Sequence, residues 1–213
     1  MKTNLKVTSL FIILLWLFHI SGIIGISLGY LDWFASKTSL NLIIILLSVV
    51  FCFDLFSLKK SIIFISIAIL GFIVEALGVN YGWFFGDYSY GENLGVKISG
   101  VPILIGINWA VLTFICAQIS HFFKINWLIK VFIGTILMLI LDFLMEFNAP
   151  RFGFWEFENS SVPLSNYIAW FGFALLFNFI FHSAKLEGNL KISSHIYIVQ
   201  FIFFTYFYVF YQI

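Results

Sequence analysis

Long apolar runs that recur from one end of this chain to the other constrain its fold more than any other feature. A helix needs ~20 apolar residues to cross the hydrocarbon core of a bilayer, and most of the runs approach that length. The expected spans are Leu10–Leu28, Leu40–Leu58, Ser61–Val79, Val101–Ile119, Trp127–Met145, Tyr167–Phe181 and His195–Tyr211. The pattern predicts an all-α, polytopic membrane helix bundle of about seven transmembrane helices, forming a single transmembrane domain over residues 1–213.

Charged side chains are scarce and unevenly placed. They make up 10% of the chain, which leaves no room for a separate soluble domain, and the net charge of +1 argues against nucleic-acid binding. The amino-terminal side of the expected bundle carries Lys2, Lys6, Lys59, Lys60, Lys124, Lys130, Lys185 and Lys191. The opposite side carries only Lys37, Lys97 and Arg151. Because cytoplasmic loops are rich in lysine and arginine, we expect a cytoplasmic N-terminus in a bacterial inner (plasma) membrane, with Ile213 on the far side.

Two carboxyl groups lie inside the expected helices, near their outer ends. Glu75 falls in the third span and Asp142 in the fifth, and Glu146 follows Asp142 by four residues, on the same helix face. A lone carboxylate at this depth costs a few kcal/mol and usually faces the interior of a bundle, where it marks a functional site. The alternative, that these acids only satisfy helix ends or neighbouring backbone groups, stays open.

An internal repeat relates the regions of about residues 61–121 and 127–182. The first copy contains Glu75, Phe85-Gly86, Tyr88, Tyr90, Val101-Pro102, Trp109 and His121. The second contains Asp142, Phe152-Gly153, Trp155, Phe157, Val162-Pro163, Trp170 and His182, at offsets of 67 and then 61 residues. Both copies run in the same direction, so we expect a parallel repeat with its axis along the membrane normal. Such an axis can bring Glu75 and Asp142 toward each other.

Aromatic residues crowd the two long outer loops. Trp83, Tyr88, Tyr90, Trp155 and Phe157 all fall at the depth where an aromatic belt is expected without any function. In an extended strand, however, alternate side chains point to the same side. The rings of Tyr88 and Tyr90 would therefore share one side of the first loop, and those of Trp155 and Phe157 one side of the second. A ring-lined pocket is therefore the functional alternative to the belt.

Several kinds of chemistry lack support in the sequence. The four histidines, His19, His121, His182 and His195, form no pair at close helical spacing that would hold a metal. There is also no glycine-rich nucleotide loop, no Cys-x-x-Cys and no Gly-x-Ser-x-Gly. We expect no cofactor and no metal. The chemistry that remains is acid catalysis by carboxyl groups among aromatic rings.

With these residues in place, the central half of the chain resembles a known family. The first copy reads Glu75-x-x-Gly78, Gly82, Phe85-Gly86-x-Tyr88-x-Tyr90, Leu94-Gly95, Val101-Pro102 and Trp109. The second reads Asp142, Gly153-x-Trp155, Val162-Pro163-x-x-Asn166 and Trp170. Together they resemble the membrane carotenoid biosynthesis family of CruF-type carotenoid 1,2-hydratases. One departure is Glu146-Phe147, where that family tends to carry Asp-Pro.

The resemblance implies a cofactor-independent hydratase of carotenoid biosynthesis. It would add water to the terminal 1,2 or 1',2' double bond of an acyclic end group, such as that of lycopene or gamma-carotene, through a tertiary cation. The implied catalytic residues are Glu75 and Asp142 as the proton-donating pair, with Glu146 and Asp87 as the acids that align water. The implied substrate-binding residues are Trp83, Tyr88, Tyr90, Trp109, Asn148, Trp155, Asn166 and Trp170.

Two alternatives remain beside the hydratase. A membrane lycopene cyclase starts with the same protonation, but an internal double bond traps its cation. A small proton-coupled transporter would also use paired acids in a repeated bundle. The acids cluster at one face only, with no polar trail across the helices, which argues against the transporter. The implied partners are the carotenoid substrate, the lipid bilayer and, potentially, other carotenoid biosynthesis enzymes.

Overall fold

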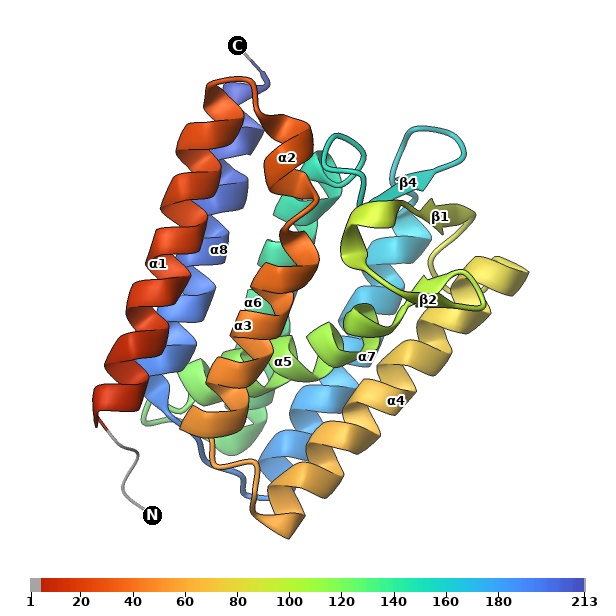
Figure 1. Ribbon diagram of the computed structural model, residues 1–213. Helices are drawn as coiled ribbons and strands as arrows, with labels where there is room; N and C mark the ends of the chain where they lie inside the picture. Colours follow the sequence, from red (N-terminus) through yellow and green to blue (C-terminus); the bar gives the residue numbers. More distant parts are fainter. Residues whose placement is uncertain (1–4, 213) are drawn as a thin grey trace.

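The computed structural model describes residues 5–212 and shows an all-α bundle (Figure 1). Its helices are α1 (Leu5–Ser27), α2 (Leu31–Ala35), α3 (Thr38–Cys52), α4 (Leu58–Tyr81), α5 (Ile103–Ser120), α6 (Trp127–Asn148), α7 (Leu164–Ser183) and α8 (Leu190–Phe210). Seven spans are long and apolar enough to cross a membrane, with α2 and α3 forming one of them. The protein is therefore an integral membrane protein, as its apolar runs predict. Lys2 and Ile213, which entered the orientation argument, lie outside the described residues.

The second expected span is wrong at its end. We expected a helix to Leu58, but α3 stops at Cys52 and α4 begins at Leu58. Between them Asp54 takes a left-handed backbone conformation with φ of 56°, which a helix cannot continue. Lys60 donates from Nζ to the Phe53 carbonyl at 2.7 Å, which satisfies a backbone group freed at the break. The apolar side chains in this turn extend the hydrophobic run without extending the helix.

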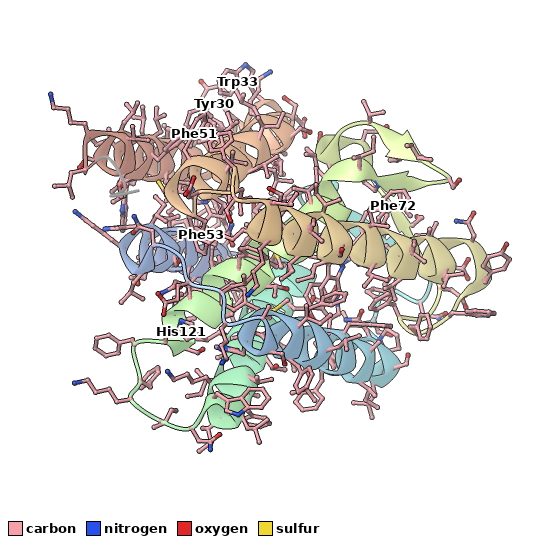
Figure 2. The ribbon with its side chains drawn as sticks, turned by 90° about the horizontal axis from the view of Figure 1, so that it is seen from below. Tyr30, Trp33, Phe51, Phe53, Phe72 and His121 are labelled. Atoms are coloured by element: carbon pink, nitrogen blue, oxygen red, sulfur yellow. The ribbon has the colours of Figure 1, made fainter. Side chains whose placement is uncertain are left out.

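Helix α5 forms the centre of the bundle. Thirteen of its 18 residues are buried, and α3, α4, α6, α7 and α8 all pack against it, as the view from below shows (Figure 2). Small residues let α4 approach closely. A Cβ atom on Gly71 would lie 2.7 Å from Cβ of Trp109, and one on Gly106 would lie 2.6 Å from Cβ of Phe72. Close contact through glycine is a usual way for membrane helices to pack, and here it fixes the position of Trp109.

Four short strands lie at one end of the bundle, opposite the beginning of α1 (Figure 1). β1 (Tyr88–Tyr90) pairs antiparallel with β4 (Trp155–Phe157), and β2 (Lys97–Ile98) pairs antiparallel with β3 (Val101–Pro102). The short 3-10 helix η1 (Glu92–Leu94) lies between β1 and β2 in the sequence. Further bonds join the two long loops: the Gly91 amide donates to the Phe154 carbonyl at 2.8 Å, and Asn93 Nδ2 donates to the Phe152 carbonyl at 2.7 Å. The loops of the two repeat units thus form one layer over the end of the bundle.

Equivalent residues of the two expected repeat units meet each other. Ser89 of β1 faces its counterpart Glu156 of β4. Deeper in the bundle, the rings of Trp109 and Trp170 stack with centroids 3.8 Å apart and planes 22° apart. Contacts between equivalent positions are what a two-fold axis running between the units produces. The parallel repeat and the direction of its axis stay a prediction.

A third such contact lies at the other end of α5 and α7. Nε2 of His121 lies 3.1 Å from Nδ1 of His182, and Nε2 of His182 lies 3.1 Å from the Ser120 hydroxyl. His182 is buried, and burial lowers the pKa of His121, which follows α5. The pair therefore packs between the two units as hydrogen-bonded side chains.

Candidate active site

Glu75 is a buried carboxyl group surrounded by donors. Its side chain is 4% exposed near the outer end of α4. The hydroxyl groups of Tyr88 and Tyr90 both donate to Oε2, the second at 2.7 Å, and Nε1 of Trp109 donates to Oε1 at 2.8 Å. Tyr88 and Tyr90 reach the same oxygen because alternate residues of β1 point to the same side.

The protonation of the two tyrosines fixes the direction of these hydrogen bonds. Burial, together with the adjacent charge of Glu75, raises the pKa of Tyr88 and Tyr90 well above the usual value of a phenol. Both phenols therefore keep their protons and act as donors. Three donors around one buried carboxyl stabilise its ionised form.

Glu146 has a similar but smaller set of partners. It is 5% exposed in the last turns of α6. Nε1 of Trp155 donates to Oε2 at 2.7 Å, and Nδ2 of Asn166 donates to Oε1 at 2.9 Å. Each of the two glutamates is thus held by a strand of the outer layer and by a neighbouring helix.

Asp142, one turn earlier in α6, has no such partners. Its side chain is fully buried, and neither carboxyl oxygen accepts a hydrogen bond from any described residue. An unpaired charge at such a position would cost several kcal/mol, so the physical expectation is a neutral carboxylic acid. Asp142 lies behind Glu146 and does not line the cavity described next.

Glu75 and Glu146 line one small cavity, of about 30 Å³. This is roughly the space of one or two water molecules. Its wall is made of aromatic rings and amides, and includes most of the residues that the sequence singled out. The lining residues are Glu75, Phe85, Tyr88, Tyr90, Ile105, Asn108, Trp109, Met145, Glu146, Trp155, Phe157, Asn166 and Trp170. We call this space the carboxyl cavity.

Besides Asp142, three of the expected site residues lie away from the carboxyl cavity. Trp83 is 54% exposed and Asp87 is exposed. Asn148 is buried, but it donates from Nδ2 to the carbonyls of Leu144 at 2.8 Å and Phe204 at 3.1 Å. The first bond lies within α6 and the second joins α6 to α8, which is a packing role.

Asn108 lines the carboxyl cavity but was not expected there. Its side chain makes no hydrogen bond within residues 5–212, so the amide is free to bind a ligand. Two features of the sequence could have identified Asn108. An amide side chain inside an apolar membrane helix is rare because its burial costs free energy, and Asn108 directly precedes Trp109. Met145 also lines the cavity, but as an apolar residue in apolar surroundings it carries no such signal.

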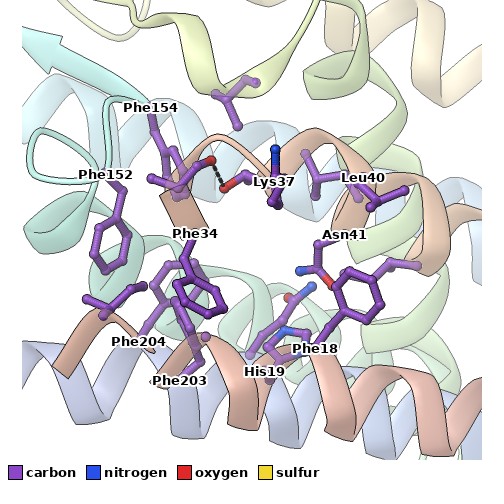
Figure 3. A pocket seen from close by; sticks show the side chains of 18 of the residues that line it. Phe18, His19, Phe34, Lys37, Leu40, Asn41, Phe152, Phe154, Phe203 and Phe204 are labelled. Carbon is purple, nitrogen blue, oxygen red and sulfur yellow. Dashed lines mark hydrogen bonds between the residues drawn. The ribbon is translucent and has the colours of Figure 1, made fainter. Parts of the chain in front are cut away.

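Two larger cavities adjoin the carboxyl cavity on different sides. One, of about 400 Å³, is lined by Glu146, Phe147, Pro150, Arg151, Trp155, Glu156, Phe157, Ser160, Ser161 and Val162, and we call it the outer vestibule. The other, of about 480 Å³, lies among α1, α2, α3 and α8 (Figure 3), and we call it the apolar cavity. Trp155 lines all three spaces. Glu146 lines the outer vestibule as well as the carboxyl cavity, whereas Glu75 lines the carboxyl cavity and neither of the larger spaces.

Comparison with known proteins identifies the family of the chain. The model of the carotenoid biosynthesis protein family matches residues 37–213. A curated relative, the bisanhydrobacterioruberin hydratase of Haloarcula japonica, is 22% identical over 156 residues, which cover 65% of this chain and 52% of the relative. The chain therefore matches only about half the length of that relative. No solved structure matches. Because the family model covers most of the sequence, the chain belongs to the carotenoid biosynthesis protein family.

Proposed function

We propose that this protein adds water to the terminal double bond of an acyclic carotenoid end group, such as that of lycopene or gamma-carotene. The observation that carries the proposal is the position of Glu75 and Glu146. Both line one aromatic cavity, which shares Glu146, Trp155 and Phe157 with the outer vestibule and Ile105, Asn108, Met145 and Trp155 with the apolar cavity. Hydration of a hydrocarbon needs access for both reactants, and the similarity to a hydratase points the same way.

Glu146 is the proposed proton donor. Two buried carboxyl groups in one small cavity disfavour a state in which both are charged. Glu75 has three donors and is the better stabilised carboxylate, while Glu146 has two. A protonated Glu146 gives its proton to the less substituted carbon of the double bond, which leaves a tertiary cation on the other carbon.

The cation is stabilised by negative charge and by aromatic faces. The Glu75 carboxylate supplies the charge, and its own donors hold it in place, which keeps it from adding to the cation. Trp155 uses its indole N–H for Glu146, so its ring face remains available for a cation–π contact.

Water completes the reaction from the outer vestibule. Glu146 and Trp155 line both that vestibule and the carboxyl cavity. Water that enters from the vestibule therefore reaches the Glu146 carboxylate, which has just lost its proton, before it reaches Glu75. The water oxygen bonds to the cationic carbon, and one of its protons returns to Glu146. The product is a tertiary alcohol, the acid is regenerated, and this scheme uses neither a metal nor a cofactor.

The proposal includes the setting of the enzyme. The lysines of the short loops favour a cytoplasmic N-terminus in a bacterial inner membrane, with the carboxyl cavity near the outer face. Enzymes that make the acyclic carotenoid, or that modify the alcohol, are the proposed neighbours.

Expression in a host that accumulates lycopene tests the activity. We expect a new pigment heavier than lycopene by one molecule of water, and no change when a metal chelator is added to isolated membranes. A pigment of unchanged mass but altered spectrum would indicate a cyclase. Unaltered lycopene alongside well-inserted protein would contradict the proposed reaction on this substrate, and gamma-carotene would then be the second substrate to try.

A further inference from the structure

The apolar cavity is the larger of the two spaces that adjoin the carboxyl cavity, and its walls are mostly hydrocarbon. Rings from four parts of the chain face it in Figure 3: Phe18 of α1, Phe34 of α2, Phe152 and Phe154 of the loop before β4, and Phe203 and Phe204 of α8. Its volume of about 480 Å³ falls in the range of cavities that hold small organic ligands.

Three polar side chains of this wall, His19, Ser21 and Thr38, bond to the backbone, whereas Asn41, Asn108 and Gln200 make no side-chain hydrogen bond within residues 5–212. Nδ1 of His19 lies 2.7 Å from the Leu15 carbonyl, and the Thr38 hydroxyl donates to the Ala35 carbonyl at 2.8 Å. The second of these bonds is the dashed line of Figure 3. Most of the lining residues are nonetheless apolar, so a ligand in the cavity meets mainly rings and alkyl groups, which suits a hydrocarbon.

The cavity reaches the lipid-facing surface of the bundle. Leu17 of α1 and Leu40 of α3 line it, and they are 58% and 48% exposed. Both helices are membrane spans, so these exposed leucines face the acyl chains of the bilayer. A carotenoid dissolved in the bilayer can thus enter sideways, between α1 and α3.

The inner end of the cavity meets the carboxyl cavity. Ile105, Asn108, Met145 and Trp155 line both spaces. We infer that the apolar cavity binds the polyene chain of the substrate while its end group points into the carboxyl cavity, which at about 30 Å³ has to widen before the end group can lie between Glu75 and Glu146. This inference rests on the proposed function and adds to it the binding site of the chain and its route of entry. The free amide of Asn108 lies where the chain would pass from one space to the other.

Filling the cavity from α1 tests the inference. Ser21 lines the cavity, and its hydroxyl bonds only to the Phe18 carbonyl of the same helix, so Ser21→Phe places a ring in the cavity with little loss elsewhere. Ser9→Phe is the matched control, because Ser9 lies on the same helix but is exposed and outside the cavity. The measurement is the lycopene retained per purified protein after expression in a lycopene-making host. We expect Ser21→Phe to retain about tenfold less than Ser9→Phe, because overpacking excludes the chain.

A second pair of variants fills the cavity from α3. Leu42 lines it and the adjacent Ile43 does not, so Leu42→Trp is the test and Ile43→Trp the control. The α1 and α3 walls of the apolar cavity are tested independently. A test variant and its control that both insert into the membrane at the wild-type level decide whether the cavity binds the chain. Retention of lycopene by a filled variant at the level of its control would overturn the inference.

The two proposals fail in different ways. If filling the cavity lowers pigment retention but the wild-type protein forms no hydrated product, the chain site stands and the proposed reaction is wrong. If the wild-type protein hydrates lycopene and the filled variants retain and hydrate it like their controls, the reaction stands and the chain lies elsewhere.

Discussion

At the residue scale, hydrogen-bond donors distinguish three buried acids of similar depth. Glu75 has three donors, Glu146 has two and Asp142 has none. The sequence predicts Glu75 and its aromatic neighbours well, because an acid inside an apolar run is conspicuous. It cannot choose between Asp142 and Glu146. The repeat spacing selects Asp142, but α6 continues to Asn148 and so carries Glu146 into the cavity.

The amide variants of the two cavity glutamates test this assignment. Glu75→Gln and Glu146→Gln should each lower hydration by roughly a hundred- to ten-thousand-fold, the usual contribution of a catalytic acid or its counter-charge. The measurement is product formed per inserted protein. Glu92→Gln and Glu158→Gln are the controls and should be silent, because both residues are exposed. Near wild-type rates in both cavity variants would assign the chemistry to other groups.

Asp142→Asn tests whether the proton donor is Glu146, as the structure indicates, or Asp142, as the repeat favours. Since Asp142 lies outside the cavity lining and is expected to be neutral, its amide should keep hydration within roughly tenfold of wild type. Pigment conversion by membranes with equal protein content measures this. A loss as large as that of Glu146→Gln would return Asp142 to the role of proton donor.

At the element scale, the packing of α4 on α5 determines where the site residues lie. The apolar runs predict these two helices, but helix contacts depend on which small residues face each other, and periodicity does not show this in helices that are apolar all round. The end of α3 illustrates the same limit. The turn after Cys52 contains apolar residues, so the break between α3 and α4 is invisible in the hydrophobic pattern.

A methyl group added at Gly71 probes that packing. Gly71→Ala places Cβ against Trp109, which cannot move freely because it donates to Glu75 and stacks on Trp170. We expect a loss of stability of about 1–3 kcal/mol and lower activity. Gly172→Ala is the control, since nothing lies within 4 Å of the added atom. Thermal unfolding in detergent measures both variants, and equal stability would contradict the described contact.

At the scale of the whole molecule, the outer layer and the two larger cavities define an orientation. Seven spans place the loops at 82–100 and 148–165 on the same side, opposite the beginning of α1. Which side faces the cytoplasm is predicted from lysine and arginine counts alone. The cavities themselves could not be predicted from the sequence, because they are spaces that side chains of distant elements leave unfilled.

Cysteine labelling tests the orientation. Glu92→Cys and Asn159→Cys should react with a membrane-impermeant maleimide added to whole cells, because both positions are exposed in the outer loops. Cys52 and Cys116 are buried and serve as an internal blank in the wild-type protein. Labelling only after the cells are opened would reverse the proposed orientation.

The origin of the added oxygen tests the central claim most directly. Membranes containing the wild-type protein, supplied with lycopene in water enriched in oxygen-18, should form an alcohol that carries the heavy oxygen, and Glu146→Gln membranes should not. Mass spectrometry of the pigment reads this without any assumption about rate. A product whose oxygen comes from dioxygen, or an isomer that contains no oxygen, would contradict hydration between Glu75 and Glu146.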